Sequence, residues 1–157
     1  MDDHRMIIER LRTHPGEIHK LTDGLTEAQL KQRPSDVKWS LHELAMHVCE
    51  VQDVFIERLA TMLTEVNPRL SSYEPDEARQ NGLYFADHFG NRLKEFEVQR
   101  TTLASLLQTL TKEQWLLEAV HPEFKHYTIH SSMESLMRHE EHHLYQMYNV
   151  FLTIHTQ

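Results

Sequence analysis

The chain has few of the residues that break or cross-link a fold. Its 157 residues include one cysteine, four glycines and five prolines. The lone Cys49 excludes an intramolecular disulfide, and a chain of this length can bury a core without one. The scarcity of glycine and proline, beside many Leu, Met, Glu and Gln residues, favours helices over sheet.

The chain also lacks long apolar runs and an excess of positive charge. No run of about 18 apolar residues and no charged-then-apolar leader is present, so we expect no membrane span and a cytoplasmic protein. The 16 Lys and Arg residues against 24 Asp and Glu give a formal net charge of −8, which disfavours a nucleic-acid partner. We expect a single domain over residues 1–157.

Apolar residues recur at helical spacing in four long segments, which are predicted to be helices. These segments cover residues 3–22, 41–63, 76–110 and 131 to the C-terminal end. A capping box, in which Ser or Thr is followed three residues later by Glu or Gln, precedes two of them and two short helices. The capping boxes begin at Thr26, Ser40, Thr111 and Ser131.

Three features modify this helical pattern. Pro15 is expected to kink or break the first helix, and Gly82 or Gly90 to weaken or divide the third. The stretch from Asn67 to Pro75 contains Pro and Ser and is predicted to be a surface loop. Four long helices with one extended connection predict an all-α four-helix bundle with short extra helices in its connections.

Histidine is unusually abundant, at 13 of 157 residues. His139 and His143 lie four residues apart in the last predicted helix, so their side chains stack on one face. This is a spacing at which two imidazoles bind one metal ion. Chance alone supplies about one such pair in a chain so rich in histidine, and His126 and His130 form a second pair in a predicted loop.

Two interpretations of the pair in the last helix remain open. The histidines are either core residues hydrogen-bonded to carbonyls or Glu side chains, or they are ligands of a metal ion. His47 favours the metal, because it adds an inward-tending imidazole from the second long helix. Three histidines leave metal positions open for water or substrate. His142 projects about a quarter-turn away and is predicted to face solvent or an interface.

Other polar residues near these histidines are candidates for catalysis. Glu140 either orients an imidazole, acts as a base, or pairs with an Arg. Gln146 is a candidate for bonding a ligand or a substrate. Glu43 and Glu50 flank His47 and are consistent with a solvated helix face.

Two segments carry a resemblance to a known family. One is Trp-Ser-Leu-His-Glu-Leu-Ala-Met-His-Val over residues 39–48, followed by Glu50 and Arg58; the other is His-Glu-Glu-His-His-Leu-Tyr-Gln-Met over residues 139–147. In these segments, and in the order and lengths of the pieces between them, the chain resembles the DinB-like metal-binding four-helix bundles. The resemblance covers nearly the whole chain.

This resemblance implies an up-down-down-up bundle and a divalent cation, often nickel or zinc, at positions that match His47, His139 and His143. It also implies a homodimer. Characterised relatives of the family include S-transferases and isomerases that use a low-molecular-weight thiol such as bacillithiol, mycothiol or glutathione.

The residues and the resemblance together predict a metal-dependent enzyme. A thiol-dependent S-transferase acting on a small electrophile is placed first because of the family, and a metal-dependent hydrolase is the other reaction that the same site supports. Two alternatives remain open: a non-catalytic bundle that binds metal or a small ligand, and a dimeric helical protein whose histidines are structural.

Overall fold

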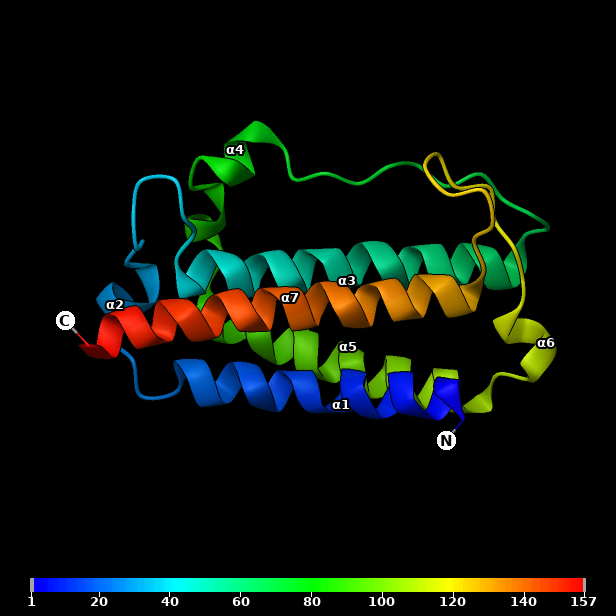
Figure 1. The fold of residues 1–157 in the computed structure, drawn as a ribbon, viewed down its shortest axis with the longest axis horizontal. Helices are drawn as coiled ribbons and strands as arrows, with labels where there is room; N and C mark the ends of the chain where they lie inside the picture. The colour runs from blue at the N-terminus through cyan, green and yellow to red at the C-terminus, as the bar shows by residue number, and fades with distance from the viewer. Residues whose placement is uncertain (1, 157) are drawn as a thin grey trace.

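Four long helices form the bundle in this computed structural model, which describes residues 2–156 (Figure 1). They are α1 (Asp3–Thr22), α3 (Leu41–Thr64), α5 (Phe89–Thr109) and α7 (Ile129–Thr156). Helices α1 and α7 run in one direction and α3 and α5 in the other (Figure 1), which confirms the up-down-down-up bundle. The connections carry short helices, as predicted: α2 (Glu27–Lys31), α4 (Glu77–Gln80), the 3₁₀-helix η1 (Leu83–Ala86) and α6 (Lys112–Trp115).

Side-chain caps begin three helices where the sequence predicts them. Thr26, Ser40 and Thr111 each accept a hydrogen bond from the backbone three residues later, and the Glu or Gln at that position bonds back. The prediction for the last long helix is wrong by two residues. Helix α7 begins at Ile129, and it is Thr128 whose Oγ1 accepts from the Ser131 N–H, at 3.1 Å.

Helix α1 runs without a break through Pro15, so of the kink or break expected there, the break is excluded. Proline has no N–H, so the carbonyl oxygen of Leu11 loses its usual helical partner. Nη1 of Arg100, from α5, donates a hydrogen bond to this oxygen at 2.6 Å. A neighbouring helix thus satisfies the carbonyl that Pro15 leaves free, and the helix continues.

The predicted third helix is divided, and the division lengthens the crossover between α3 and α5. Residues 76–110 form α4, η1 and α5 rather than one helix. The division includes Gly82, whose φ of 104° lies in the left-handed region that favours glycine. Two consecutive long helices that run in the same direction need such a long return, which Figure 1 shows passing outside the bundle.

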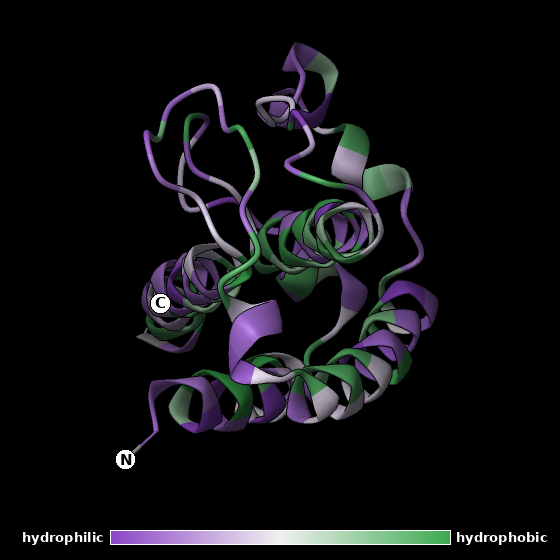
Figure 2. Ribbon diagram, turned by 90° about the vertical axis from the view of Figure 1, so that its right-hand side faces the viewer, coloured by the Kyte–Doolittle hydropathy of each residue, from purple (hydrophilic) through white to green (hydrophobic). Residues whose placement is uncertain are grey.

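The core has two apolar clusters with a buried polar layer between them. One cluster is built around Leu11, Phe55 and Met137, and the other around Ile18, Leu44 and Met147. The residues between them along the four long helices include four buried polar side chains: His14, Gln52, Arg100 and Glu140. Each long helix carries both hydrophobic and hydrophilic residues around its circumference (Figure 2). Within residues 2–156, none of the helices combines the length and the apolar character that crossing a membrane requires.

Replacing the two glycines Gly16 and Gly82 by alanine is expected to have opposite effects on stability. Gly82→Ala forces a Cβ into a left-handed conformation and places it 3.4 Å from the Phe85 ring, so we expect a loss of about 1–2 kcal/mol. Gly16 lies inside α1 with open space around it, so Gly16→Ala should gain about 0.5–1 kcal/mol. Urea unfolding of both variants measures this, and a Gly82→Ala protein as stable as the wild type contradicts the strained turn.

Candidate metal centre

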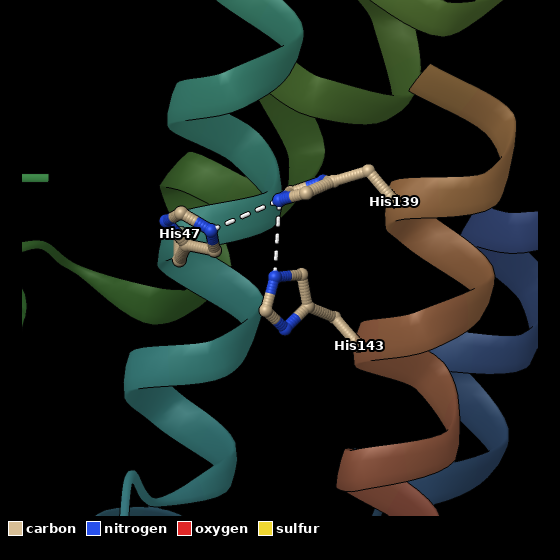
Figure 3. Close-up of side chains that lie close together, drawn as sticks. All are labelled: His47, His139 and His143. Atoms are coloured by element: carbon tan, nitrogen blue, oxygen red, sulfur yellow. Dashed lines mark hydrogen bonds between the residues drawn. The ribbon is translucent and has the colours of Figure 1, made fainter. Parts of the chain in front are cut away.

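Three histidines from two long helices converge inside the bundle. His47 projects from α3, and His139 and His143 project from consecutive turns of α7 (Figure 3). Nε2 of His139 lies 3.1 Å from Nε2 of His47 and 3.0 Å from Nε2 of His143. Ligand atoms of all three rings lie within 4.8 Å of one another. The structure thus brings together the three residues that the sequence predicts as metal ligands.

The contacts among these nitrogens are poorly satisfied as hydrogen bonds. A neutral imidazole nitrogen carries either one proton or one lone pair. Nε2 of His139 faces two other nitrogens, so it can complete only one of the two hydrogen bonds. A divalent cation accepts a lone pair from every nitrogen at once. The chemistry of this donor set therefore fits a metal ion better than it fits a hydrogen-bonded cluster.

The outer nitrogens of two rings have hydrogen-bond partners. Nδ1 of His47 lies 3.0 Å from the hydroxyl of Tyr84. Nδ1 of His143 donates to Oε1 of Gln146 at 2.6 Å, which leaves the lone pair of that ring on Nε2. Nδ1 of His139 is buried with no hydrogen-bond partner within residues 2–156. Gln146, a predicted candidate for bonding a ligand or substrate, therefore orients a candidate metal ligand.

Burial keeps the three imidazoles neutral. Burial, reinforced by the neighbouring imidazoles, lowers the pKa of His47 to about 3 and the pKa of His139 to about 4. Burial also lowers the pKa of His143, although the hydrogen bond to Gln146 acts in the opposite direction. A neutral imidazole is the form that binds metal, so at neutral pH these residues need not lose a proton first.

Glu140 forms a buried ion pair. Its Oε2 accepts a hydrogen bond from Nη1 of Arg100 at 3.0 Å and lies 2.6 Å from Nδ1 of His14, while its Oε1 contacts Nη2 of Arg100. Burial raises the pKa of Glu140, but Arg100 and His14 lower it by more, so the net shift is downward. Of the alternatives that the sequence left open for Glu140, the structure therefore shows the pairing with an Arg.

Tyr84 and Glu50 surround His47 on its outer side. The Tyr84 hydroxyl donates to Oε2 of Glu50, and the Tyr73 hydroxyl donates to the same oxygen at 2.6 Å. Burial, with Glu50 adding to it, raises the pKa of both tyrosines, so the phenols keep their protons. The Glu50 side chain is partly buried, with 28% of its surface exposed, and its carboxylate is hydrogen-bonded to the two phenols as well as facing solvent. The sequence does not single out Tyr84, because it lies in a segment predicted as helix and only the fold brings it to His47.

A pocket of about 670 Å³ adjoins the histidine cluster. His143, Gln146 and Trp39 line it, and the Trp39 ring lies 5.1 Å from the ring of His47. A volume of this size suits a small molecule. His143 therefore joins the histidine cluster to a pocket that a small substrate could enter, and a cation held by the three imidazoles would supply Lewis acidity close to it.

One of the charged side chains that line this pocket, Arg33, is held in an ion pair. Arg33 donates from Nε to Oε1 of Glu43 at 2.8 Å and from Nη2 to Oε2 at 2.5 Å. Glu43 is fully buried, so the solvated face expected for it is wrong. Among the described residues that line the pocket, Asp36 is the only carboxylate.

His142, His126 and His130 are not part of this group of candidate ligands. His142 is exposed, as its position on the helix predicts, and its ring lies 5.1 Å from that of His143. His126 is exposed, and His130 lies 3.4 Å from Glu134. In the part of the chain that the structure describes, His47, His139 and His143 form the one group of three or more candidate metal ligands.

The fold and the site together define a class of protein, the four-helix bundles with a three-histidine candidate metal centre. Residues 10–147 match the family model of the DinB superfamily. The chain therefore belongs to the DinB superfamily, which confirms the resemblance carried by residues 39–48 and 139–147.

Two relatives of the chain are named as putative metal-dependent hydrolases. A Halalkalibacterium halodurans protein named "Putative metal-dependent hydrolase BH0277" is 28% identical over 143 residues, which cover 90% of this chain and 82% of that protein. "Putative metal-dependent hydrolase OB0413" of Oceanobacillus iheyensis is 23% identical over 138 residues, covering 87% of this chain and 79% of the relative.

A solved structure shares the fold. It is YfiT from Bacillus subtilis, described as a probable metal-dependent hydrolase with an unusual four-helix bundle topology. The TM-score is 0.83 at 21% sequence identity, and the match covers 94% of this chain and 85% of the YfiT chain. The likeness confirms the four-helix bundle.

The metal-free protein is expected to lose stability as pH falls from 6.5 toward about 4. Over this range the unfolded chain protonates its histidines at the ordinary pKa of 6.5, whereas folded His47 and His139 stay neutral until the pH approaches about 3 and about 4. The unfolded state then binds more protons, so acid favours unfolding. Urea unfolding at about pH 7 and about pH 5 measures the loss. His47→Gln should reduce it, and the exposed control His126→Gln should not; equal losses in all three proteins contradict the assignment.

Removing the charge of Glu140 is expected to destabilise the fold strongly. Glu140→Gln leaves Arg100 buried without its counter-charge, so we expect a loss of about 3–5 kcal/mol. The neighbour Glu141 pairs with Arg10 at the surface, at 3.1 Å, so Glu141→Gln should cost at most about 1 kcal/mol. Urea unfolding compares the two variants, and equal stability would show that the buried pair does not hold the bundle.

Proposed function

We propose that the chain is a metal-dependent hydrolase of small molecules that binds a divalent cation through His47, His139 and His143. The observation that carries this proposal is the convergence of three imidazole nitrogens beside a pocket of about 670 Å³. Three histidine ligands leave at least one coordination position open for water or substrate. Catalytic metal sites need such a position, whereas structural sites are filled by four protein ligands. The names of the two curated relatives and the description of YfiT support hydrolysis.

The cation, when bound, supplies Lewis acidity that lowers the pKa of a water or thiol beside the substrate. The chain supplies the lone pairs, the orientation and the pocket. Gln146 orients His143 through its carbonyl oxygen, and its amide N–H₂ is the group we assign to bond the substrate, since Gln146 also lines the pocket. Glu140 contributes indirectly: its hydrogen bond from Arg100 fixes the position of α7, which carries His139 and His143.

Thiol-dependent S-transfer to a small electrophile is the second candidate. The specific observation in its favour is the shortage of carboxylates at the pocket, where Asp36 is the only one among the described lining residues. Hydrolysis commonly uses a positioned acid or base. A thiol whose pKa a bound cation lowers would release its proton to solvent, and the thiolate would need no positioned acid or base to attack the electrophile. A low-molecular-weight thiol of the bacillithiol or glutathione kind would be the co-substrate, as the family resemblance implies.

Several finer properties stay predictions, some from the family resemblance and the location from the sequence alone. Three imidazoles suit both nickel and zinc, so the donor set does not choose between the two cations. The homodimer and the cytoplasmic location likewise remain predictions. Each of these is independent of the reaction proposed for the site.

Purified protein is expected to carry one divalent cation per chain. His47→Ala and His143→Ala each remove one of three ligands and should abolish stoichiometric metal, measured by elemental analysis after dialysis. His142→Ala is the matched control, because His142 neighbours His143 in the chain but is exposed, and it should keep the wild-type metal content. Wild-type protein that takes up no divalent cation, with nickel, zinc, copper and iron each offered, contradicts the proposal.

The metal-loaded protein then distinguishes the reactions. Incubation with a panel of small esters and amides, and separately with an electrophile plus glutathione or bacillithiol, measures hydrolysis and thiol consumption. The metal-dependent hydrolase is supported if the His142→Ala variant keeps the hydrolytic activity and the His143→Ala variant loses it. Thiol consumption alone supports the second. A loaded protein with no rate above the metal-free background is a binding protein rather than an enzyme.

A further inference from the structure

Tyr84 lies between a candidate metal ligand and a carboxylate. It is fully buried and belongs to η1 on the crossover, not to a long helix. Its hydroxyl oxygen lies 3.0 Å from Nδ1 of His47 and contacts Oε2 of Glu50. Glu50 projects from α3, three residues after His47, so one helix supplies both ends of this chain of hydrogen bonds.

The carboxylate decides the direction of these hydrogen bonds. An ionised carboxylate accepts hydrogen bonds and cannot donate them, and a phenol has one proton to give. Tyr84 and Tyr73 both direct that proton at Oε2 of Glu50. The side of the Tyr84 oxygen that faces His47 then offers only lone pairs, so Nδ1 of His47 must be the donor. A neutral His47 with its proton on Nδ1 has its lone pair on Nε2.

Arg79 holds this arrangement in place from the crossover side. Its Nε lies 3.4 Å from Oε1 of Glu50, and its guanidinium carbon lies 5.0 Å from the centre of the Tyr84 ring. The Arg79 guanidinium thus contacts both the Glu50 carboxylate and the face of the Tyr84 ring. Glu50 therefore accepts from two phenols through one oxygen and faces a guanidinium with the other.

We propose that Glu50 and Tyr84 are positioning residues, which hold His47 in its Nδ1–H tautomer and aim the Nε2 lone pair at the cation. The inference rests on the proposed function, because the cation is the group that this lone pair would bind. Nε2 is the His47 atom that faces His139, at 3.1 Å. Hydrogen-bond partners behind a ligand typically change metal affinity by about 10- to 100-fold.

The three candidate ligands are held in three different ways. Gln146 orients His143 from within the same helix, at 2.6 Å. His139 has no partner on Nδ1 within residues 2–156. His47 alone is oriented by a residue of the crossover, and that segment also forms one wall of the pocket through Pro75, Gln80 and Asn81. The crossover therefore takes part in the site at both the ligand and the pocket.

The tautomer of His47 can be measured without any metal. In ¹⁵N-labelled, metal-free protein, long-range proton–nitrogen spectra distinguish a ring protonated on Nδ1 from one protonated on Nε2, and the signals missing in His47→Gln identify the residue. We expect the Nδ1–H form in the wild type and a mixture in Tyr84→Phe, which removes the acceptor while keeping the ring. Tyr73→Phe is the matched control: it deletes a hydrogen bond to the same Glu50 oxygen but does not touch His47, so it should keep the wild-type form.

Metal affinity gives the second measurement. Competition with a chromophoric chelator should show that Tyr84→Phe weakens binding of Ni²⁺ or Zn²⁺ by about 10- to 100-fold, while Tyr73→Phe stays close to the wild type. Glu50→Gln should also weaken binding, because an amide N–H₂ can donate to Tyr84 and let the phenol donate to His47 instead. If Glu50 acts through Tyr84, adding Glu50→Gln to Tyr84→Phe should cause no further loss.

The inference is overturned if both Tyr84→Phe and Glu50→Gln keep the Nδ1–H form of His47 and the wild-type affinity. Phenylalanine fills nearly the same volume, and circular dichroism reports whether the variant folds; if Tyr84→Phe does not fold, the tautomer in Glu50→Gln decides. A wild-type protein that takes up none of nickel, zinc, copper and iron contradicts the proposed function. The metal-free spectra still decide the tautomer in that case, so the two failures are distinguishable.

Discussion

The guanidinium of Arg100 makes the interaction on which the bundle depends. From α5 it reaches all three other long helices: Glu140 on α7, Gln52 on α3 at 2.7 Å and the carbonyl of Leu11 on α1 at 2.6 Å. Removing one partner of a buried charge costs several kcal/mol, so a shift of any one helix along the others is strongly opposed. The bond to Leu11 also lets α1 continue through Pro15. One side chain thus sets the register of the helices and keeps α1 whole.

That register also places the candidate metal centre. Glu140 on α7 points at Arg100, and its neighbour His139 then faces α3, where His47 lies 3.1 Å away. On α7, Glu140 of the buried polar layer directly follows His139 of the histidine cluster. Burial lowers the pKa of the imidazoles and so favours the neutral form that a cation needs, whereas the charged pair beside them is stabilised by its partners. The interior of the bundle therefore holds both the Arg100–Glu140 ion pair and a group of neutral imidazoles.

Prediction from the sequence succeeded where local pattern decides the structure and failed where a distant residue does. The apolar stripes find the four long helices, and three of the four capping boxes place helix starts correctly, because these signals act within a few residues; only the start of the third long helix is misplaced by its stripe. A break, one of the two outcomes expected at Pro15, is absent, because Arg100 lies 89 positions after Leu11 and still meets its freed carbonyl, beyond any local rule. Gly82 divides the third segment, as the sequence allowed, but the resulting turn also brings Tyr84 to His47.

By itself, the sequence determined the helical class, the up-down-down-up family and the positions of the three histidines, since periodicity, caps and the two family segments are written along the chain. Only the tertiary structure decided which nitrogen of each imidazole faces the others, and that Glu140 is committed to Arg100. It also decided that Glu50 and Tyr84 lie behind His47. Side-chain orientation depends on hydrogen-bond partners from other helices and from the crossover, and those partners meet only when the bundle is packed.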